Sequence, residues 1–384
     1  MKEKLFATSA TAFAAFFAKV RATLFSYILS FVLAVSLFGC AENGFYQGDL
    51  SMFSCVDDEV RPQADSVALA KPHSQFFAVY DTLAMVYIPG LDGYSFEIYN
   101  IQTGDLMGSF FPHGHGHGEF LCVEPVGQMF LENGQLTAII AAFNEQKLLR
   151  WNITQSVAQG RTVYSESPLQ DDENGISHSH CTEIGRDSVL AFRHCETMSV
   201  NGQTHVVEPV WKILDRPTGK LLDELHEFRF PEIHEGTKVM PELFFTGFSC
   251  VKPDRSRLVE AMYCLPQISI TDLKHGRMSG YLMKGHDDYS LFSTDMQDAH
   301  CYYVGVQSND RYIFALWCGE MMSELSAVGY DEVHVFDWDG RMLKKVKLSV
   351  PVQSIYLDQA NDLLYGCHQD RQPLYRYKVA DMGL

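Results

Sequence analysis

The sequence lacks the short motifs that mark most enzymes and many structural metal sites. None of its ten cysteines forms a Cys-x-x-Cys pair, which excludes zinc-ribbon and thioredoxin-like sites. There is no Gly-x-Ser-x-Gly turn, no His-Glu-x-x-His pair, no Walker loop and no dinucleotide-binding Gly-x-Gly-x-x-Gly. No cofactor is therefore predicted, and the sequence favours a protein that binds over one that catalyses.

Basic residues are scarce. The chain has 30 lysines and arginines against 48 aspartates and glutamates, which gives a net charge of −18. Residues 1–39 hold four basic residues and one acidic residue, so their removal would take the net charge to −21. A surface of this charge repels the phosphate backbone, and we expect no nucleic-acid partner.

Long apolar runs are absent except near the start. Residues 24–38 form an apolar run of fifteen residues that follows Lys19 and Arg21. This length suits a signal peptide and is short for a membrane span of about twenty residues. The run ends in Leu37-Phe38-Gly39-Cys40, which resembles the bacterial lipobox. That resemblance implies a lipidated Cys40, a signal peptide over residues 1–39 and a tether over residues 40–62; ordinary secretion is the alternative.

What the sequence does contain is a repeat of short β-rich runs, each opened by an Asp or Asn turn. The clearest unit covers residues 310–348, where Asp339-Gly340 separates two alternating runs and predicts a hairpin. Similar turns occur at six positions, with gaps of 52, 54, 67, 56 and 52 residues: Asp81, Asn133, Asp187, Asp254, Asp310 and Asp362. A period of this size with several strands per unit is typical of a β-propeller.

Six turns predict an all-β fold, a six-bladed β-propeller of four-stranded antiparallel blades over residues 63–384. The last unit lacks an outermost strand, so we expect residues 65–69 to pair with residues 374–379 and close the ring. The run before each turn should be the innermost strand, at residues 73–79, 120–127, 177–184, 245–251, 301–307 and 352–357. The alternative is an array of two β-sandwiches, but no linker-like segment divides the chain.

The repeat, taken with the export signal, resembles the TolB-like six-bladed propeller lipoproteins of bacteria. The resemblance covers residues 63–379 and rests on the repeated Asp-x-apolar openings and on two further segments. These are Tyr99-Asn-Ile-Gln-Thr-Gly-Asp-Leu106 and His113-Gly-His-Gly-His-Gly-Glu-Phe120. The second is similar to a Gly-rich loop of that family, with His where Pro is usual. The resemblance implies fold and export, to the outer membrane or a periplasm-facing position in the bacterial envelope. It implies no catalytic residue.

Histidines provide the candidate site. Innermost strands of a propeller run parallel to one another, so their beginnings should gather at one mouth of the central channel. His73, His178, His180 and His300 lie near such beginnings. Imidazoles gathered there could bind a ligand or a metal. The alternative is a set of unrelated histidines bonded to the backbone.

Two other groups of residues are weaker candidates for a functional role. His113, His115 and His117 alternate with glycines and are possible metal ligands, although ordering such a loop costs backbone entropy. The nine cysteines other than Cys40 mostly lie in β-rich runs, where we expect buried free thiols. An exported protein could oxidise some of them.

Three functions follow from these observations, of which the third is a structural role in an envelope assembly with no small ligand. The first is a lipid-anchored binding module of the cell envelope, whose partner is a protein, a small molecule or a glycan. The second is a metal-dependent hydrolase or lactonase that uses histidines at the channel mouth. The second needs carboxylates beside those histidines, and the predicted inner strands offer Glu124 and Glu183.

Overall fold

The predicted turn residues lie between the first and second strands of the sheets. Asp81, Asn133 and Asp362 adopt positive φ angles of 55°, 50° and 51°. Asp and Asn tolerate this left-handed conformation better than other non-glycine residues, because their short polar side chains bond to the nearby backbone. The recurrent Asp or Asn therefore marks a tight turn, and the β-branched and aromatic runs on either side form strands.

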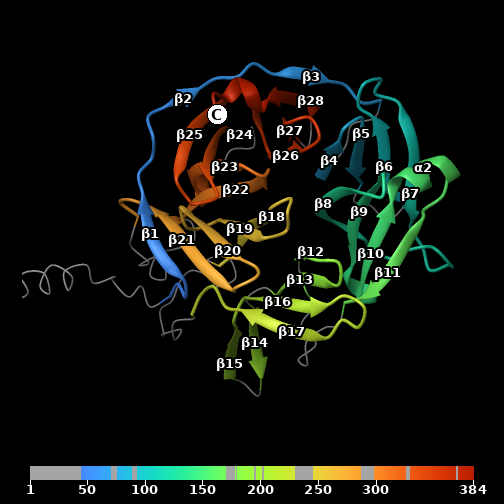
Figure 1. Ribbon diagram of the computed structural model, residues 1–384, viewed down its shortest axis with the longest axis horizontal. Helices are drawn as coiled ribbons and strands as arrows, with labels where there is room; N and C mark the ends of the chain where they lie inside the picture. The colour runs from blue at the N-terminus through green and yellow to red at the C-terminus, as the bar shows by residue number, and fades with distance from the viewer. Residues whose placement is uncertain are drawn as a thin grey trace, which may run out of the picture. The chain divides into compact units, whose positions relative to one another are not determined.

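A computed structural model gives the arrangement of these strands. It describes residues 45–70, 76–88, 93–169, 178, 180–193, 196–200, 203–229, 245–286, 298–325, 329–368 and 371–384. Six sheets of four or five strands surround a central axis (Figure 1). The predicted six-bladed β-propeller is confirmed.

Each of the first three blades contains four strands. Blade 1 comprises β4 (Phe76–Tyr80), β5 (Leu83–Tyr87), β6 (Tyr94–Asn100) and β7 (Leu106–Pro112). Blade 2 comprises β8 (Glu124–Glu132), β9 (Gln135–Ala142), β10 (Lys147–Asn152) and β11 (Tyr164–Pro168). Blade 3 comprises β12 (His180–Glu183), β13 (Ser188–Arg193), β16 (Val210–Asp215) and β17 (Leu221–Leu225).

The other three blades each contain a strand from the start of the chain. Blade 4 comprises β18 (Gly247–Val251), β19 (Arg257–Met262), β20 (Gln267–Asp272), β21 (Arg277–Met283) and β1 (Asp49–Phe53). Blade 5 comprises β22 (His300–Ser308), β23 (Tyr312–Met321), β24 (Tyr330–Asp337), β25 (Met342–Val352) and β2 (Glu59–Val60). Blade 6 comprises β26 (Ser354–Asp358), β27 (Leu363–His368), β28 (Arg371–Lys378) and β3 (Asp65–Val67).

Strand β3 closes the ring. It pairs antiparallel with β28, so that Val67 lies opposite Leu374 and Asp65 lies opposite Arg376. An ion pair of 3.2 Å between Arg376 Nη2 and Asp65 Oδ2 supports the same register. The predicted pairing of residues 65–69 with residues 374–379 is confirmed for three residue pairs of β3.

The segment before β3 covers the outer edges of two further blades. Strand β1 pairs parallel with β21, and β2 pairs parallel with β25, so residues 49–67 run along the outside of blades 4, 5 and 6 (Figure 1). We call this segment the belt. Phe53 is buried, and its ring meets Phe336 edge-on with 5.3 Å between centroids. Part of the expected tether over residues 40–62 thus belongs to the propeller.

Two local elements differ from the expectation. A hairpin of β14 (Glu196–Val200) and β15 (Gln203–Val207) is inserted between β13 and β16, which lengthens the unit between Asp187 and Asp254. A short helix, α2 (Ile153–Gln159), follows β10 in a fold that was expected to be all-β. The Asn152 side chain accepts a hydrogen bond from the Gln155 backbone N–H at 2.9 Å and so caps this helix.

The core lies between adjacent blades. Trp151 of blade 2 is fully buried against aromatic rings of blade 1, with centroid distances of 5.4 Å to Phe96, 5.4 Å to Phe110 and 5.2 Å to Phe111. A four-stranded sheet has two apolar faces, and each face is buried by the neighbouring blade. Stability therefore depends on an unbroken ring.

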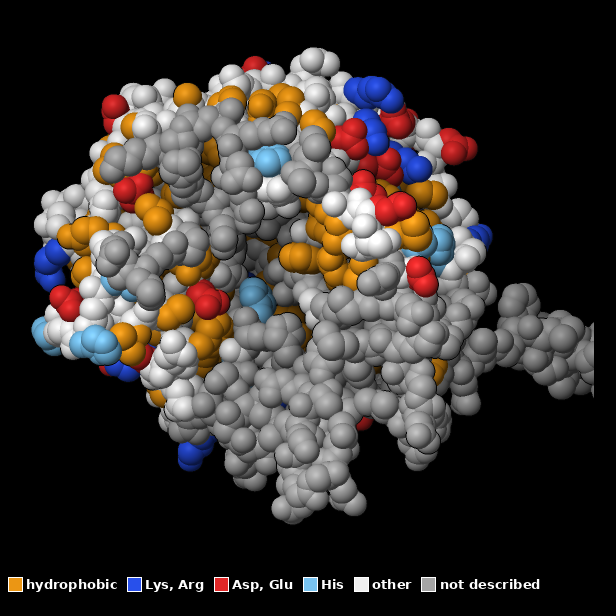
Figure 2. Space-filling view, turned by 180° about the vertical axis from the view of Figure 1, so that it is seen from behind, with side chains coloured by type: hydrophobic (Ala, Val, Ile, Leu, Met, Phe, Trp, Pro, Cys, Tyr) orange, Lys and Arg blue, Asp and Glu red, His pale blue; other side chains and the backbone are white. Residues whose placement is uncertain are grey.

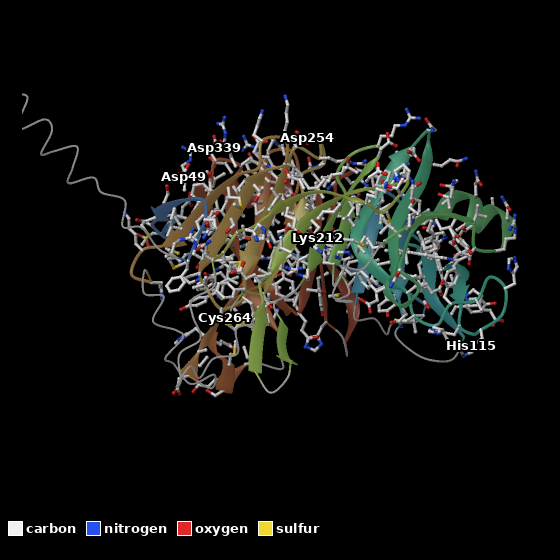
Figure 3. The ribbon with its side chains drawn as sticks, turned by 90° about the horizontal axis from the view of Figure 1, so that it is seen from below. Asp49, His115, Lys212, Asp254, Cys264 and Asp339 are labelled. Atoms are coloured by element: carbon white, nitrogen blue, oxygen red, sulfur yellow. The ribbon has the colours of Figure 1, made fainter. Side chains whose placement is uncertain are left out.

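The loops divide between two faces of the ring. Asp254, in the turn between the first and second strands of blade 4, and Asp339, between the third and fourth strands of blade 5, lie on one side (Figure 3). Cys264 and His115 lie on the opposite side (Figure 3). We call the first side the turn face, because it carries the Asp and Asn turns of the repeat.

The described cysteines are free thiols, as expected, and four of the eight are buried. Cys195 lies outside the described residues. Within the described part of the chain, no helix is long and apolar enough to span a membrane.

A polar network is buried inside blade 5. His334 is fully buried, and its ring stacks on Trp317 with 4.5 Å between centroids. Its Nε2 lies 2.8 Å from Glu332 Oε1, and its Nδ1 lies 3.2 Å from the hydroxyl oxygen of Tyr303. Burial lowers the pKa of His334 more than the Glu332 carboxylate raises it, so the ring stays neutral in the folded protein.

Ring closure predicts that substitutions at two neighbouring residues of β3 lower the free energy of unfolding by unequal amounts. Val67 is buried, and Ser66 is exposed. We expect Val67→Asp to lower the free energy of unfolding by about 3 kcal/mol, because a carboxylate would be buried without a partner. The control Ser66→Asp should change it by less than about 0.5 kcal/mol. Urea denaturation measures both, and equal midpoints for the two variants would contradict closure by β3.

The His334 network predicts a loss of stability in mild acid. Unfolded histidine titrates near pH 6.5. The folded pKa is lower, so the unfolded chain binds more protons below that pH, and the free energy of unfolding falls as pH drops through 6.5 towards the folded pKa. Thermal melts from pH 8 to pH 5 measure this effect. The variant His334→Gln should show a shallower pH dependence than the wild type, and an unchanged slope would refute the assignment.

Candidate functional site: the central cavity

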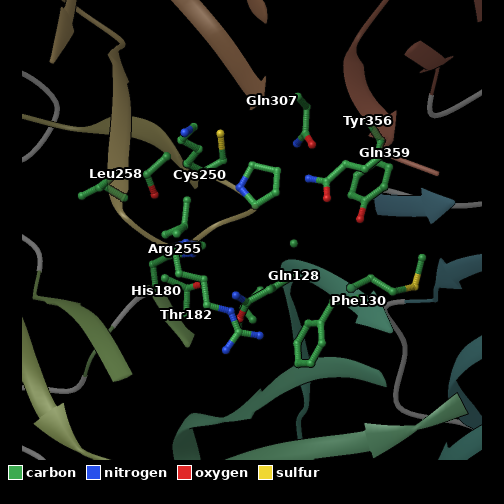
Figure 4. Close-up of a pocket in the computed structure, with 17 residues that line it drawn as sticks. Gln128, Phe130, His180, Thr182, Cys250, Arg255, Leu258, Gln307, Tyr356 and Gln359 are labelled. Atoms are coloured by element: carbon green, nitrogen blue, oxygen red, sulfur yellow. The ribbon is translucent and has the colours of Figure 1, made fainter. Parts of the chain in front are cut away.

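A cavity of about 100 Å³ lies where the inner strands of five blades converge. Its walls come from β8, β12, β18, β22 and β26, and from the turns that follow β18 and β26 (Figure 4). Because Lys252, Pro253 and Arg255 belong to the turn after β18, the cavity lies towards the turn face. Figure 2 shows the face opposite the turn face, where the surface is also hollowed near the centre of the ring, with hydrophobic side chains at its border.

Amide and hydroxyl groups form the polar part of the wall. Three glutamines, Gln128, Gln307 and Gln359, line the cavity together with Thr182 and Ser249. The Gln307 and Gln359 side chains extend towards the centre of the cavity (Figure 4). Apolar side chains that include Val126, Met129 and Leu258 complete the wall.

Gln128 connects two blades as well as lining the cavity. Its Nε2 donates to the backbone oxygen of Glu183 at 2.8 Å, and its Oε1 accepts from the backbone N–H of Glu183 at 2.8 Å. The side-chain amide thus pairs with the edge of β12 as a neighbouring strand would. A backbone irregularity between Pro125 and Met129, with φ of 76° at Gly127, brings Gln128 to this position.

The charged groups of the wall are basic. None of the residues that line the cavity is an aspartate or glutamate, whereas Lys252 and Arg255 both contribute. Lys252 Nζ forms an ion pair of 2.6 Å with Asp254. The Arg255 guanidinium lies over the Phe130 ring, 4.6 Å from its centroid. The cavity is therefore an unusual place on a chain of net charge −18.

The two weakly acidic groups of the wall are neutral at physiological pH. Burial raises the pKa of the Cys250 thiol to about 12, and its sulfur donates to the Ser308 hydroxyl at 3.3 Å. Burial also raises the pKa of Tyr356, and the Asp358 carboxylate adds to that effect. A thiol that stays protonated is a poor nucleophile, so Cys250 does not resemble a catalytic cysteine.

Ser249 and Lys252 have the Ser-x-x-Lys spacing that some acyl-transfer enzymes use. On a helix this spacing places both side chains on one face, whereas residues three apart on a strand point to opposite faces. Here Ser249 lies in β18, and the Lys252 ammonium is held by Asp254. The spacing therefore does not provide a serine with a neighbouring base.

Of the histidines that we expected at one mouth of the channel, His180 lines the cavity, and its ring meets Trp211 edge-on with 6.0 Å between centroids. His178 is buried and is not part of the cavity wall. His300 begins β22 and stacks on Tyr302. His73 lies outside the described residues, so the gathering of all four stays a prediction.

The His-Gly loop is remote from the cavity. His113 forms a bridge with Phe120, and its Nε2 lies 3.2 Å from Ser95 Oγ. His115 and His117 are exposed, and His115 lies on the side opposite the turn face (Figure 3). Glu119 shapes the loop, because its Oε2 accepts a hydrogen bond of 2.8 Å from the backbone N–H of Gly116.

The expected carboxylates also lie away from the cavity. Glu183 is fully buried and forms an ion pair with Arg150, whereas Glu124 is exposed at the start of β8. Among the residues that the structure describes, no group of three or more His, Cys, Asp or Glu side chains is arranged to hold a metal ion. The metal site predicted from the histidines therefore has no support among the described residues.

Comparisons with known proteins identify no family for this chain. No model of a known protein family matches the sequence, and no curated protein matches it. One similar crystal structure is a member of the DUF4221 family from Bacteroides vulgatus. It has a TM-score of 0.48 and 12% sequence identity, over 82% of this chain and 98% of that chain. Another is a Bacteroides fragilis protein described as exported, with a TM-score of 0.48 and 10% identity, over 83% of this chain and 98% of that chain.

Some cavity residues lie where the sequence repeat alone can locate them. Gln307 and Ser249 lie inside inner strands that the repeat predicts, and Arg255 follows the turn marker Asp254 directly. The pattern of histidines at strand beginnings does not point to these positions. Polar residues at the ends of inner strands, next to the recurrent turns, were the better signal.

Proposed function

We propose that this protein is an exported, lipid-anchored β-propeller that acts as a binding module of the bacterial cell envelope, with the central cavity as its ligand site. The observation that carries the binding role is the chemistry of the cavity wall. Amide, hydroxyl and guanidinium groups line a small space together with apolar side chains, and most of them stand on strands that the ring holds rigidly.

Binding fits this wall better than catalysis. General acid–base work needs a group that titrates near the working pH beside a reacting atom, and nucleophilic work needs an activated hydroxyl or thiol. The Cys250 thiol is held neutral by burial, and the Lys252 ammonium is paired with a carboxylate. The wall also lacks carboxylates, which a glycosidase would use in pairs.

Export and anchoring rest on the sequence. The apolar run of residues 24–38 ends in Leu37-Phe38-Gly39-Cys40, and acylation at Cys40 would hold the protein on a membrane. The first described residue, Phe45, follows Cys40 by five positions, and the belt begins soon after it. Five extended residues span at most about 18 Å. A lipid at Cys40 would therefore keep the propeller close to the bilayer surface.

The proposed anchor predicts that substitution of one cysteine releases the protein from membranes. Wild-type protein expressed with its signal segment in a Gram-negative host should sediment with membranes and incorporate an alkyne-labelled fatty acid. Cys40→Ser should remove the label and release the protein into the soluble fraction. The matched control Cys55→Ser, at an exposed cysteine of the belt, should behave as the wild type. Label retained in Cys40→Ser would show that another residue is acylated, and an unlabelled wild type would show that there is no such anchor.

The binding role predicts ligand-dependent stabilisation that a filled cavity abolishes. The full-length chain in detergent is heated with a panel of neutral sugars, amino acids, small carboxylates and divalent metal ions. A ligand at 100 times its Kd should stabilise the folded state by about 2.7 kcal/mol. Ser249→Trp, or the smaller Ser249→Leu, should remove the shift, whereas Ser66→Trp on the outer strand of blade 6 should keep it.

Two outcomes of this panel would count against the proposal. If no compound shifts the wild-type melting temperature, the cavity is not a ligand site for these classes. If a divalent metal ion alone gives the shift and confers hydrolysis of a lactone or ester, the metal-dependent hydrolase becomes the better description. Melting of the unliganded variants reports whether each has folded.

A further inference from the structure

Arg255 occupies a position that a simple structural role does not explain. It lies in the turn after β18 with φ of 61°, and its backbone N–H donates to the Lys252 carbonyl at 2.7 Å. Its side chain crosses from blade 4 to blade 2, where the guanidinium lies over the Phe130 ring at 4.6 Å. An aromatic face attracts the cation but takes up none of its N–H donors as an oxygen would.

A neighbouring arginine, Arg150, has the carboxylate partners that Arg255 lacks. Arg150 approaches the same Phe130 ring at 5.6 Å, but it also forms ion pairs with Glu132, at 2.7 Å, and with Glu183. Arg255 has no carboxylate within ion-pair distance among the described residues, although the chain carries 48 acidic residues. A half-buried guanidinium with no carboxylate partner is a ready partner for an anion.

The remaining polar groups of the cavity suit the same kind of ligand. Gln128 uses one N–H of its amide for the Glu183 carbonyl, and Gln359 donates to the Ser308 carbonyl at 3.3 Å. Each amide nitrogen keeps a second N–H for a ligand. Gln307 and Thr182 add a further amide and a hydroxyl. No carboxylate in the wall opposes an incoming anion, and the Cys250 thiol carries no charge.

Volume and apolar surface limit the size and class of the ligand. A buried water molecule needs roughly 10–15 Å³ of cavity volume. A cavity of about 100 Å³ therefore has room for a molecule of only several non-hydrogen atoms. Phe130, Met129 and Pro253 provide apolar wall beside the guanidinium. A carboxylate pairs with the two-pronged guanidinium donors, and a short carbon chain can contact the apolar wall.

We infer that the central cavity binds a small organic monocarboxylate of about five to ten non-hydrogen atoms, with Arg255 as the partner of its carboxylate group. This inference rests on the proposed function, because it takes the cavity as the ligand site. It adds the chemical class of the ligand and the residue that selects it.

Paired ligands test the inference on the full-length chain. Calorimetry at low ionic strength compares aliphatic and hydroxy monocarboxylates of three to six carbons with their primary amides, which match them in shape and lack the charge. At least one carboxylate should bind the wild type, at least tenfold more tightly than its amide. Added salt should weaken binding, because screening reduces the attraction between ligand and guanidinium.

Variants of two arginines identify the residue responsible. Arg255→Gln should raise the Kd for the carboxylate at least tenfold and leave any weak amide binding unchanged. Arg255→Lys should give an intermediate Kd, because lysine keeps the charge without the two-pronged geometry. The control Arg341→Gln changes an exposed arginine that is paired with Asp337 and lies outside the cavity, and it should bind as the wild type.

The other outcomes overturn the inference in distinct ways. Equal binding of carboxylates and amides, or wild-type affinity in Arg255→Gln, would remove Arg255 as the selecting group. Preference for inorganic phosphate over every carboxylate would show that the class is wrong. Tight binding of a neutral compound that Ser249→Leu abolishes would keep the proposed function and end this inference. No binding by any compound would end both.

Discussion

The structure depends on the burial of both faces of every blade. A sheet of four strands presents two apolar surfaces, and only a neighbouring sheet on each side can cover them. Closure of the ring is therefore a condition for the stability of all six blades rather than a local contact of blade 6. Strand β3 meets this condition by pairing with β28, so that both ends of the described propeller are fixed in one sheet.

The belt covers the outer edges of three of the six blades. Edge strands expose unpaired backbone groups that attract other chains. Residues 49–67 supply a strand to the outer edge of blades 4, 5 and 6, whereas blades 1, 2 and 3 end in their own fourth strands, β7, β11 and β17. The belt therefore protects one half of the ring and joins three blades through one continuous segment.

The cavity joins side chains from separate blades of the same ring. The Gln128 amide of β8 bonds to the backbone of β12, and the Arg255 guanidinium of blade 4 lies over the Phe130 ring of β8. Charges along the rest of the chain are mostly acidic, but those of the cavity wall are basic or neutral. The proposed ligand site thus differs in charge from the chain as a whole.

The sequence by itself determined the number of blades, the turns and the closing strand. These features are local or periodic: Asp81 and Asp362 adopt the left-handed conformation that short polar side chains favour in tight turns, and a missing fourth strand is visible as a gap in the repeat. Only the tertiary structure decided which side chains share the cavity. A backbone irregularity at Gly127 sets the position of Gln128, and the sequence pattern does not predict it. The pairing of β1 and β2 was also hidden, because short runs of weak pattern become strands only where an open sheet edge lies beside them.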